Sequence, residues 1–265
     1  MKRISRRAAL GRLSQSGGLA GAAAVGLPLL NAAGEQAGTA RRLKVMVAGG
    51  HPDDPESGCG GTIARYTNLG REVVILYLTR GEAGIPGKSH KEAAAIRTAE
   101  CERACGILKA RPMFAGQIDG STEINPARYD QFWKIVEAEQ PELVFTHWPI
   151  DTHPDHRAAS LLAYDAWLRS GRKFALFYFE VDQGSQTQDF RPTHYVDITA
   201  TESRKRTACF AHASQDPAGF YALHDMMNRF RGMECGAKYA EAFVRHVQND
   251  PGWLPMQGIG ALAPT

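Results

Sequence analysis

The chain has few cysteines, no repeated segment and no apolar stretch of the length that a membrane-spanning helix requires. Its five cysteines are an odd number without paired spacing, which argues against a disulfide framework and predicts free thiols. Cys101 and Cys105 lie one helical turn apart on an apolar stripe, so we expect both to be buried. The apolar run at residues 17–30 is 14 residues long and contains Pro28, whereas a spanning helix needs about 20. These shortages argue against a disulfide scaffold, a repeat protein and a permanent membrane span.

Little net charge remains once the N-terminal segment is set aside. Five of the 31 basic residues and one of the 28 acidic residues lie in residues 1–40, which leaves 26 basic against 27 acidic residues. The formal charge of +3 therefore comes from the N-terminus, and residues 41–265 carry a net charge of −1. Such a domain has no general basic surface for a polyanion, so we expect no nucleic-acid partner. A content of 43% hydrophobic and 22% charged residues is typical of a globular protein.

The basic N-terminus resembles a twin-arginine export signal. Arg6 and Arg7 precede the apolar run, and small residues between positions 32 and 40 offer several cleavage sites. We expect residues 1–40 to be a signal and linker that the twin-arginine machinery recognises. The rest of the chain would then be exported to the periplasm or another extracytoplasmic compartment. The alternative is a disordered N-terminus without a signal, which Ala9 favours because such signals usually place a large apolar residue there.

Beyond the N-terminal segment, strand patterns alternate with helical patterns. Short apolar and β-branched runs predict strands at residues 43–48, 73–79, 143–147 and 174–181. Apolar residues at helical spacing predict helices at residues 57–69, 92–109, 129–139 and 158–169. This alternation predicts an α/β fold, a Rossmann-like three-layer sandwich around a mostly parallel sheet, formed by residues 41–265 as a single domain.

Two clusters of His and Asp residues directly follow two of the predicted strands. His51-Pro52-Asp53-Asp54 comes after the first strand, and Asp151-Thr152-His153-Pro154-Asp155-His156 comes after the strand at residues 143–147. Open parallel sheets place their sites at the carboxyl ends of strands, where connections that reverse direction leave a crevice. If the two strands are adjacent, both clusters face one point. Their imidazole and carboxylate groups could then hold a divalent metal with one position open for water.

Other interpretations are open for the same residues. His51-Pro52-Asp53-Asp54 is also typical of a turn in which an Asp caps the following helix. The ligand types suit the non-haem iron of 2-oxoglutarate oxygenases, but those enzymes are antiparallel β-rolls, whereas this chain alternates strands with helices. Gly58, Gly60 and Gly61 lack the spacing of a dinucleotide loop, and no Lys follows as in a phosphate-binding loop. We therefore assign these glycines to tight packing of a helix against a strand.

With both clusters in view, the chain resembles the PIG-L or LmbE-like family of zinc-dependent de-N-acetylases. The resemblance runs from residue 43 to about residue 215, with Arg97-x-x-Glu100 between the two clusters and His212-x-Ser214-Gln215 after them. Pro55 departs from the family pattern, in which an acidic residue commonly follows the two aspartates; Glu56 stands one place later. The resemblance implies a Zn²⁺ cofactor, with another divalent metal such as Fe²⁺ as the alternative.

The roles of family residues transfer to matching positions of this sequence. The resemblance implies three metal ligands, which are His51, Asp54 and His156. It implies that Asp53 is the general base, that His153 stabilises the oxyanion, and that Asp155 holds the His153 ring. Direct binding of Asp155 to the metal is the alternative for that carboxylate. Arg97 matches an arginine that lies near the substrate or the acetate product in similar enzymes.

The helical spacing around Arg97 also singles this residue out. Arg97 falls on the apolar face of its predicted helix, where a charged group is rarely without a function. The alternative is an ion pair within the helix to Glu100, three residues later. We expect His147, at the end of its strand, to pack against or support the site, and we assign no role to His212.

The chemistry of amide hydrolysis agrees with these roles. Attack at neutral pH needs an activated water, and zinc lowers the pKa of water to about 7 while it polarises the carbonyl. Asp53 is adjacent to a ligand and could take the proton and return it to the leaving amine. We predict a hydrolase that removes the acetyl group from an N-acetylated amino sugar or related glycoconjugate. The alternative is a non-catalytic sugar-binding protein on the same fold; the motifs identify neither the individual substrate nor the oligomeric state.

Overall fold

The structure is a computed structural model that describes residues 43–248 and 261–262. The predicted export signal lies outside these residues. Among the described residues, no helix has both the length and the apolar character that crossing a membrane requires. The elements in chain order are β1 (Lys44–Gly49), α1 (Asp54–Asn68), β2 (Glu72–Tyr77), α2 (His90–Leu108), β3 (Arg111–Phe114), α3 (Pro126–Glu139), β4 (Leu143–His147), α4 (Pro154–Arg169), β5 (Ala175–Phe179), β6 (His194–Asp197), α5 (Glu202–Cys209), η1 (Ala213–Gln215), α6 (Pro217–Cys235), β7 (Ala240–Arg245) and β8 (Ala261–Leu262).

The strands form one sheet in the order β3-β2-β1-β4-β5-β7-β6-β8. Neighbours from β3 to β5 are parallel, whereas β7, β6 and β8 are joined by antiparallel pairing. The chain proceeds from β1 to β2 and β3 on one side, and then returns to β4 on the other side of β1. The order in which the chain adds strands to the sheet therefore reverses between β1 and β4. Open α/β sheets leave a crevice at such a point. The predicted mostly parallel sheet is confirmed, with an antiparallel edge in addition.

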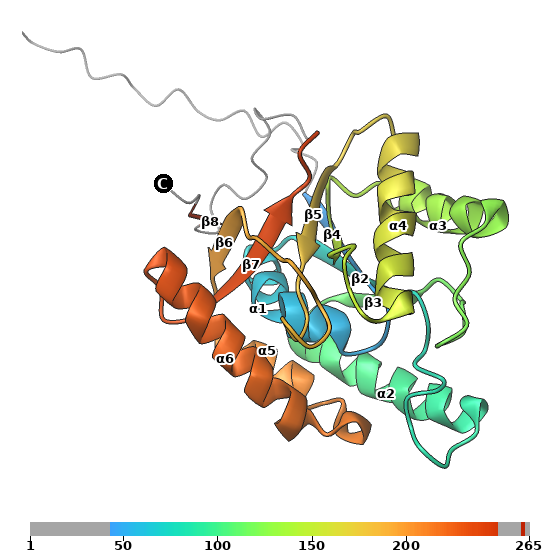
Figure 1. The fold of residues 1–265 in the computed structure, drawn as a ribbon, viewed down its shortest axis with the longest axis horizontal. Coiled ribbons are helices and arrows are strands. Elements are labelled where there is room, and N and C mark those ends of the chain that lie inside the picture. The colour runs from blue at the N-terminus through green and yellow to red at the C-terminus, as the bar shows by residue number, and fades with distance from the viewer. Residues whose placement is uncertain (1–42, 249–260, 263–265) are drawn as a thin grey trace, which may run out of the picture. The chain divides into compact units, whose positions relative to one another are not determined.

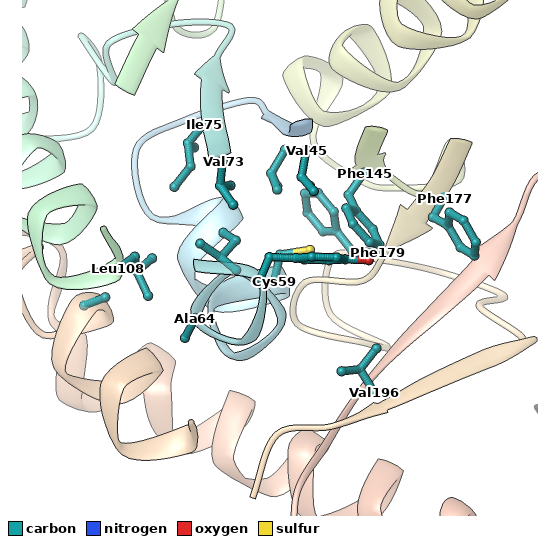
Figure 2. Close-up of a cluster of buried hydrophobic side chains, with 14 of the residues drawn as sticks. Val45, Cys59, Ala64, Val73, Ile75, Leu108, Phe145, Phe177, Phe179 and Val196 are labelled. Carbon is teal, nitrogen blue, oxygen red and sulfur yellow. The ribbon is translucent and has the colours of Figure 1, made fainter. Parts of the chain in front are cut away.

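Helices cover both faces of the sheet and form a three-layer sandwich, as predicted (Figure 1). Successive side chains of a strand point to opposite faces, so each central strand supplies two cores. Val45 and Val47 of β1 pack with side chains of α1 and α2, including Cys59 (Figure 2). Met46 and Ala48 of the same strand pack on the other face with side chains of α3 and α4. Burial on both faces explains why these strands are continuous apolar runs rather than alternating ones.

Glycines bring α1 close to the elements that it covers. A Cβ atom on Gly58 would lie 2.5 Å from the ring of Phe179 on β5, and one on Gly61 would lie 2.6 Å from Ile198. No side chain larger than hydrogen fits at these distances without movement of its neighbours. The prediction that these glycines allow tight packing is therefore confirmed, as is the prediction for the thiols, since all five cysteines are free.

The structure differs from the sequence prediction at helix starts and in the C-terminal third. Helix α1 begins three residues before its predicted start and α4 begins four residues before. Pro55 and Pro154 occupy the first turns, where a missing N–H removes no helical hydrogen bond, and the apolar pattern begins only later. Strand β7 was not predicted, because the polar Glu241 interrupts its apolar pattern. That carboxylate is buried and lies 2.8 Å from the Lys205 ammonium group.

Candidate metal centre and active site

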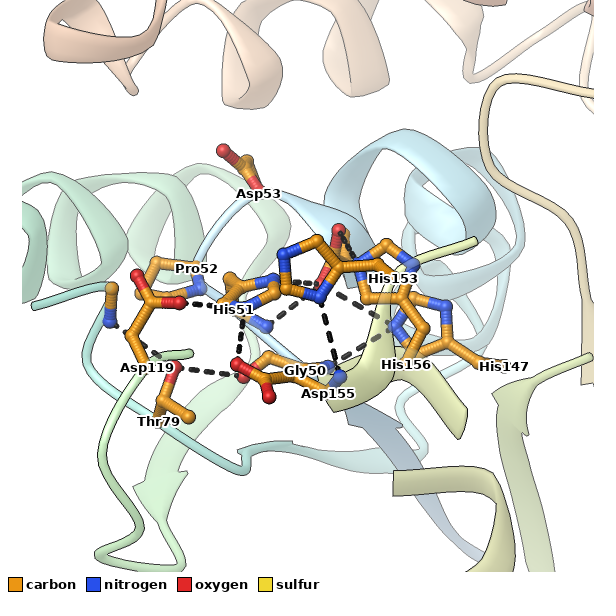
Figure 3. A network of polar contacts seen from close by, with 12 residues as sticks. Gly50, His51, Pro52, Asp53, Thr79, Asp119, His147, His153, Asp155 and His156 are labelled. Carbon is orange, nitrogen blue, oxygen red and sulfur yellow. Dashed lines mark hydrogen bonds and ion pairs between the residues drawn. The ribbon is translucent and has the colours of Figure 1, made fainter. Parts of the chain in front are cut away.

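The two His and Asp clusters meet at one edge of the sheet. Strands β1 and β4 are parallel neighbours, and Ala48 of β1 is in register with Thr146 of β4. The segments that follow each strand therefore leave the sheet side by side. Figure 3 shows the side chains of both clusters gathered around His51. The expectation that the clusters face one another is confirmed.

The three side chains proposed as metal ligands are buried, and both imidazoles contact the Asp54 carboxylate. His51 Nδ1 lies 3.1 Å from Asp54 Oδ2, and His156 Nε2 lies 3.3 Å from Asp54 Oδ1. The two imidazoles contact different oxygens of Asp54. Among the described residues, three groups have ligand atoms that all lie within 4.8 Å of one another: His51, His153 and His156; Asp54, His147 and His156; and His51, Asp119, His153 and Asp155. His51 and His156 thus share one group, and Asp54 and His156 share another. Burial alone would raise the pKa of Asp54, but the three neighbouring imidazoles, His156 first, lower it well below its ordinary value. An ionised carboxylate beside two imidazoles is a suitable donor set for a divalent metal.

The second nitrogen of His51 contacts two carboxylates. His51 Nε2 lies 3.0 Å from Asp155 Oδ2 and 3.2 Å from Asp119 Oδ1. Asp155 also accepts hydrogen bonds from the Gly120 amide at 2.8 Å and the Thr122 hydroxyl at 2.6 Å. Burial would raise the pKa of Asp155, but these three donors lower it far below its ordinary value. The Asp155 carboxylate therefore orients the His51 ring, and would stand behind it as the supporting carboxylate if His51 Nδ1 held a metal.

This geometry differs from the role that the resemblance implies for Asp155. The His153 ring does not share a hydrogen bond with the Asp155 carboxylate; instead His153 Nδ1 accepts the main-chain N–H of Asp155 at 3.2 Å. The reason is local, because His153 caps the start of α4 and its ring turns toward the first free amides of that helix. With Nδ1 as acceptor, the neutral ring carries its proton on Nε2. Burial, followed by the charges of His51 and His156, lowers the pKa of His153.

Asp53 lies beside these groups with its carboxylate paired to Arg97. Arg97 Nη2 is 2.6 Å from Asp53 Oδ2 and also donates to the carbonyl of Pro52. The backbone of Asp53 is left-handed, with φ 107°, and its N–H donates to the Glu56 carboxylate at 3.2 Å. Burial raises the pKa of Asp53, and the Arg97 guanidinium opposes that rise. Arg97 is only 3% exposed and is directed at Asp53 rather than at Glu100, so the pair within the helix does not form.

Asp53 is also held by a buried network around Glu56, which the sequence analysis did not predict. The Glu56 carboxylate accepts a hydrogen bond from the Tyr77 hydroxyl at 2.6 Å and lies 3.2 Å from His212 Nε2. Burial would lower the pKa of His212, but Glu56 raises it above its ordinary value. Glu56 therefore lies at the point where α1, β2 and the segment before η1 meet. The contact also gives His212 a structural role.

Two further side chains belong to the site: His147, which was expected to pack against or support it, and Asp119, which was not predicted. His147, fully buried at the end of β4, stacks on His156 with ring centroids 4.0 Å apart and accepts the Gly50 N–H at 3.1 Å. Burial, with the charge of His156, lowers its pKa to about 4. Asp119 lies in the loop between β3 and α3, far in sequence from both clusters, and an Asp-Gly pair in a loop carries no ligand motif. A turn signal was the only sequence feature that could have drawn attention to it.

Comparison with known proteins agrees with the site. The profile of GlcNAc-PI de-N-acetylase, PIG-L, matches residues 46–167. Diacetylchitobiose deacetylase of Thermococcus kodakarensis is 30% identical over 217 residues, which cover 75% of this chain and 81% of that protein. The probable N-acetyl-alpha-D-glucosaminyl L-malate deacetylase 2 of Bacillus anthracis is 29% identical over 182 residues, which cover 64% and 80%.

Solved structures share the fold. N,N'-diacetylchitobiose deacetylase of Pyrococcus horikoshii is 27% identical with a TM-score of 0.67, over 77% of this chain and 83% of that one. GalB of Pseudomonas putida, a 4-carboxy-2-hydroxymuconate hydratase, has a TM-score of 0.71 at 21% identity, over 80% and 99%, and shows the fold alone. The same architecture thus carries different chemistry, and the His and Asp residues of the site must decide function. By its sequence identity, coverage and converging motifs, the chain belongs to the PIG-L family of de-N-acetylases.

Proposed function

We propose that this protein is a metal-dependent hydrolase that removes the acetyl group from the nitrogen of an N-acetylated amino sugar or related glycoconjugate. The observation that carries the proposal is a buried cluster of imidazoles and carboxylates that could hold a metal, in which His51 and His156 both contact Asp54 and Asp53 lies beside them. The two relatives act, by their names, on substrates that contain N-acetylated glucosamine. Their shared chemical feature is the amide bond of the acetamido group.

Zn²⁺ is the metal that we propose for this site, with Fe²⁺ as the alternative, held by His51, Asp54 and His156. A bound divalent metal supplies Lewis-acid polarisation of the amide carbonyl and a lowered pKa for water. Asp155 and Asp119 keep the proton of His51 on Nε2, because both carboxylates accept there. With a metal bound, Nδ1 would be the nitrogen left free to act as the ligand atom.

Asp53 is proposed as the general base. Its carboxylate accepts the proton of the attacking water and later returns it to the amine nitrogen, which must leave protonated. Arg97 holds Asp53 Oδ2 in place and favours the ionised form that a base requires. His153 is proposed to donate a hydrogen bond from its Nε2–H to the developing oxyanion, an effect of about 2.7–4 kcal/mol for a single donor.

The test is a metal determination combined with an assay for free amine. We expect about one zinc per chain, and release of amine from N,N'-diacetylchitobiose that a chelator abolishes and added Zn²⁺ restores. Asp53→Asn should keep its metal and lose activity by two to four orders of magnitude, the usual contribution of a positioned base. Full activity of metal-loaded Asp53→Asn would contradict the assignment of the base.

The non-catalytic alternative makes the opposite prediction. A sugar-binding protein on this fold would bind acetylated amino sugars in its metal-loaded form without release of amine. The intact base and ligand positions speak against this alternative. The third interpretation, a 2-oxoglutarate oxygenase, expects an antiparallel β-roll and does not agree with the parallel strands β3 to β5.

We also propose that the twin-arginine machinery exports the protein to the periplasm or another extracytoplasmic space. The support is the sequence around Arg6 and Arg7, which precedes an apolar run that is too short to span a membrane. The test is fractionation of cells that produce the full chain. Replacement of both arginines by lysine should retain the protein in the cytoplasm with its charge unchanged. Export of that variant at the wild-type level would exclude this route.

A further inference from the structure

A small pocket adjoins the site between the start of α1, the turn after β5 and the start of α6. Its cavity volume is about 150 Å³, and its lining includes Asp53, Asp54, Asp182, Gln186 and His224. Pockets for drug-sized ligands have about 300–1,000 Å³, so this one suits a single sugar ring. Because Asp53 and Asp54 form part of its wall, a ring in the pocket would carry its acetamido group to the proposed base and metal ligand.

The pocket is rich in carboxylates and poor in cations. Asp53, Asp54 and Asp182 all line it, and none of its described lining residues is Lys or Arg. The guanidinium of Arg97 lies behind Asp53, where it is buried and donates to Asp53 and to Pro52. An anionic group inside the pocket would therefore meet carboxylates without a guanidinium or ammonium partner. Such an arrangement disfavours one class of ligand by repulsion.

Asp182 is the member of this set that takes no part in the proposed catalysis, and it is held firmly. Its main-chain carbonyl accepts hydrogen bonds from the amides of Ser185 at 3.0 Å and Gln186 at 2.8 Å, which closes a turn. Its backbone is left-handed, with φ 41°. Its Oδ1 lies 3.2 Å from His224 Nε2 on α6. The turn thus fixes the main chain of Asp182, and the helix that borders the pocket places His224 beside its carboxylate.

We propose that this pocket binds an uncharged sugar unit of the substrate, and that Asp182 makes the enzyme selective against substrates with carboxylate groups near that unit. A carboxylate only accepts hydrogen bonds, so it suits the hydroxyl donors of a sugar and repels another anion. The inference rests on the proposed deacetylase function. Of the substrates named for the relatives, diacetylchitobiose is uncharged, whereas glucosaminyl L-malate carries two carboxylates. The structure assigns this chain to the uncharged class.

The test compares kcat/KM for N,N'-diacetylchitobiose and for N-acetylglucosaminyl L-malate with the metal-loaded wild-type protein. We expect the uncharged substrate to be preferred at least tenfold. Asp182→Asn should raise kcat/KM for the malate conjugate about tenfold, because one like charge is removed at short range. The matched control is Asp189→Asn, an exposed residue of the same loop with φ 52°, which is not part of the pocket lining and should change neither value.

Binding measurements separate this proposal from the proposed function. Calorimetric titration of metal-loaded Asp53→Asn with both compounds reports selectivity without turnover. Preferential binding of the uncharged compound, reduced in an Asp53→Asn, Asp182→Asn double variant, supports the pocket assignment even if no wild-type turnover is found. Equal or better binding and turnover of the malate conjugate would overturn it and leave the deacetylase function standing. An unchanged preference in Asp182→Asn would also overturn it.

Discussion

Asp155→Asn tests whether the Asp155 carboxylate orients a metal ligand or the proposed oxyanion donor. In the structure its Oδ2 is 3.0 Å from His51 Nε2, while the His153 ring receives only the main-chain N–H of Asp155. A carboxylate behind a ligating imidazole fixes the ring and raises its basicity. Removal of that negative charge should therefore weaken the metal site first. Catalysis by fully loaded protein should fall less than metal affinity.

The size of the effect follows from the contacts around His51. Loss of such a supporting partner typically lowers metal affinity 10- to 100-fold. Asp119 also lies 3.2 Å from His51 Nε2 and stays in place, so we expect about a tenfold loss in Asp155→Asn, the low end of that range. The double variant with Asp119→Asn removes both carboxylates and should approach about 100-fold. The two changes share a partner, so their effects need not be additive.

Competition with a chromophoric zinc chelator measures the dissociation constants, and kcat is then measured at saturating Zn²⁺. Thermal unfolding of the metal-free proteins reports whether loss of the fully buried Asp155 carboxylate destabilises the fold. Asp130→Asn is the control, because that carboxylate is exposed and pairs with Arg169 on the neighbouring helix. Unchanged zinc affinity with a large fall in kcat would refute the reasoning. That result would instead support the role that the family resemblance implies for Asp155, in which its carboxylate holds the His153 ring.

Two other substitutions test the base and the packing of the first helix. Arg97→Met should move the acid limb of the pH profile of kcat/KM to higher pH. Burial raises the pKa of Asp53 and the Arg97 charge opposes that rise, so loss of the charge should raise this pKa further. The limb follows this pKa because the base must be ionised to accept a proton. Arg97→Lys should keep the limb near its wild-type position, and an unmoved limb in Arg97→Met would contradict the pairing. Gly58→Ala should lower the free energy of unfolding by about 1–3 kcal/mol in urea titrations, because its Cβ would lie 2.5 Å from the Phe179 ring. Gly106→Ala on α2, with no atom within 4 Å, should raise it by about 0.5–1 kcal/mol, and equal effects at both positions would exclude the packing explanation.

The meeting of the two clusters could be predicted from the sequence because parallel strands impose it. A strand of five or six residues fixes where the next residue leaves the sheet, and the clusters begin only two residues after β1 ends and four residues after β4 ends. Adjacency of β1 and β4 was an assumption, and the parallel pairing of the two strands confirms it. The ligand positions needed only this coarse geometry.

The partners of individual atoms could not be predicted in the same way. Which nitrogen of His51 faces Asp54 and which faces Asp155 depends on the rotation of one ring, and sequence spacing does not specify a side-chain rotation. The family resemblance placed the Asp155 carboxylate at His153, yet it contacts His51, which is 104 positions away. Asp119 was missed because its place in the site depends on the path of the loop after β3. Long-range contacts of this kind appear only once the chain is folded.

Glu56 explains why the chain can have Pro55 where the family commonly has an acidic residue. Non-glycine residues with φ near 107° are strained, at about 1–3 kcal/mol each, and persist where their surroundings fix them. Asp53 is fixed at both ends, since its N–H donates to Glu56 and its carboxylate pairs with Arg97. Pro55 cannot supply the acceptor, but Glu56 can, and its second oxygen is held by Tyr77. The acidic group has thus moved by one position along the helix, and in this chain it holds the proposed base in its strained conformation before any substrate binds.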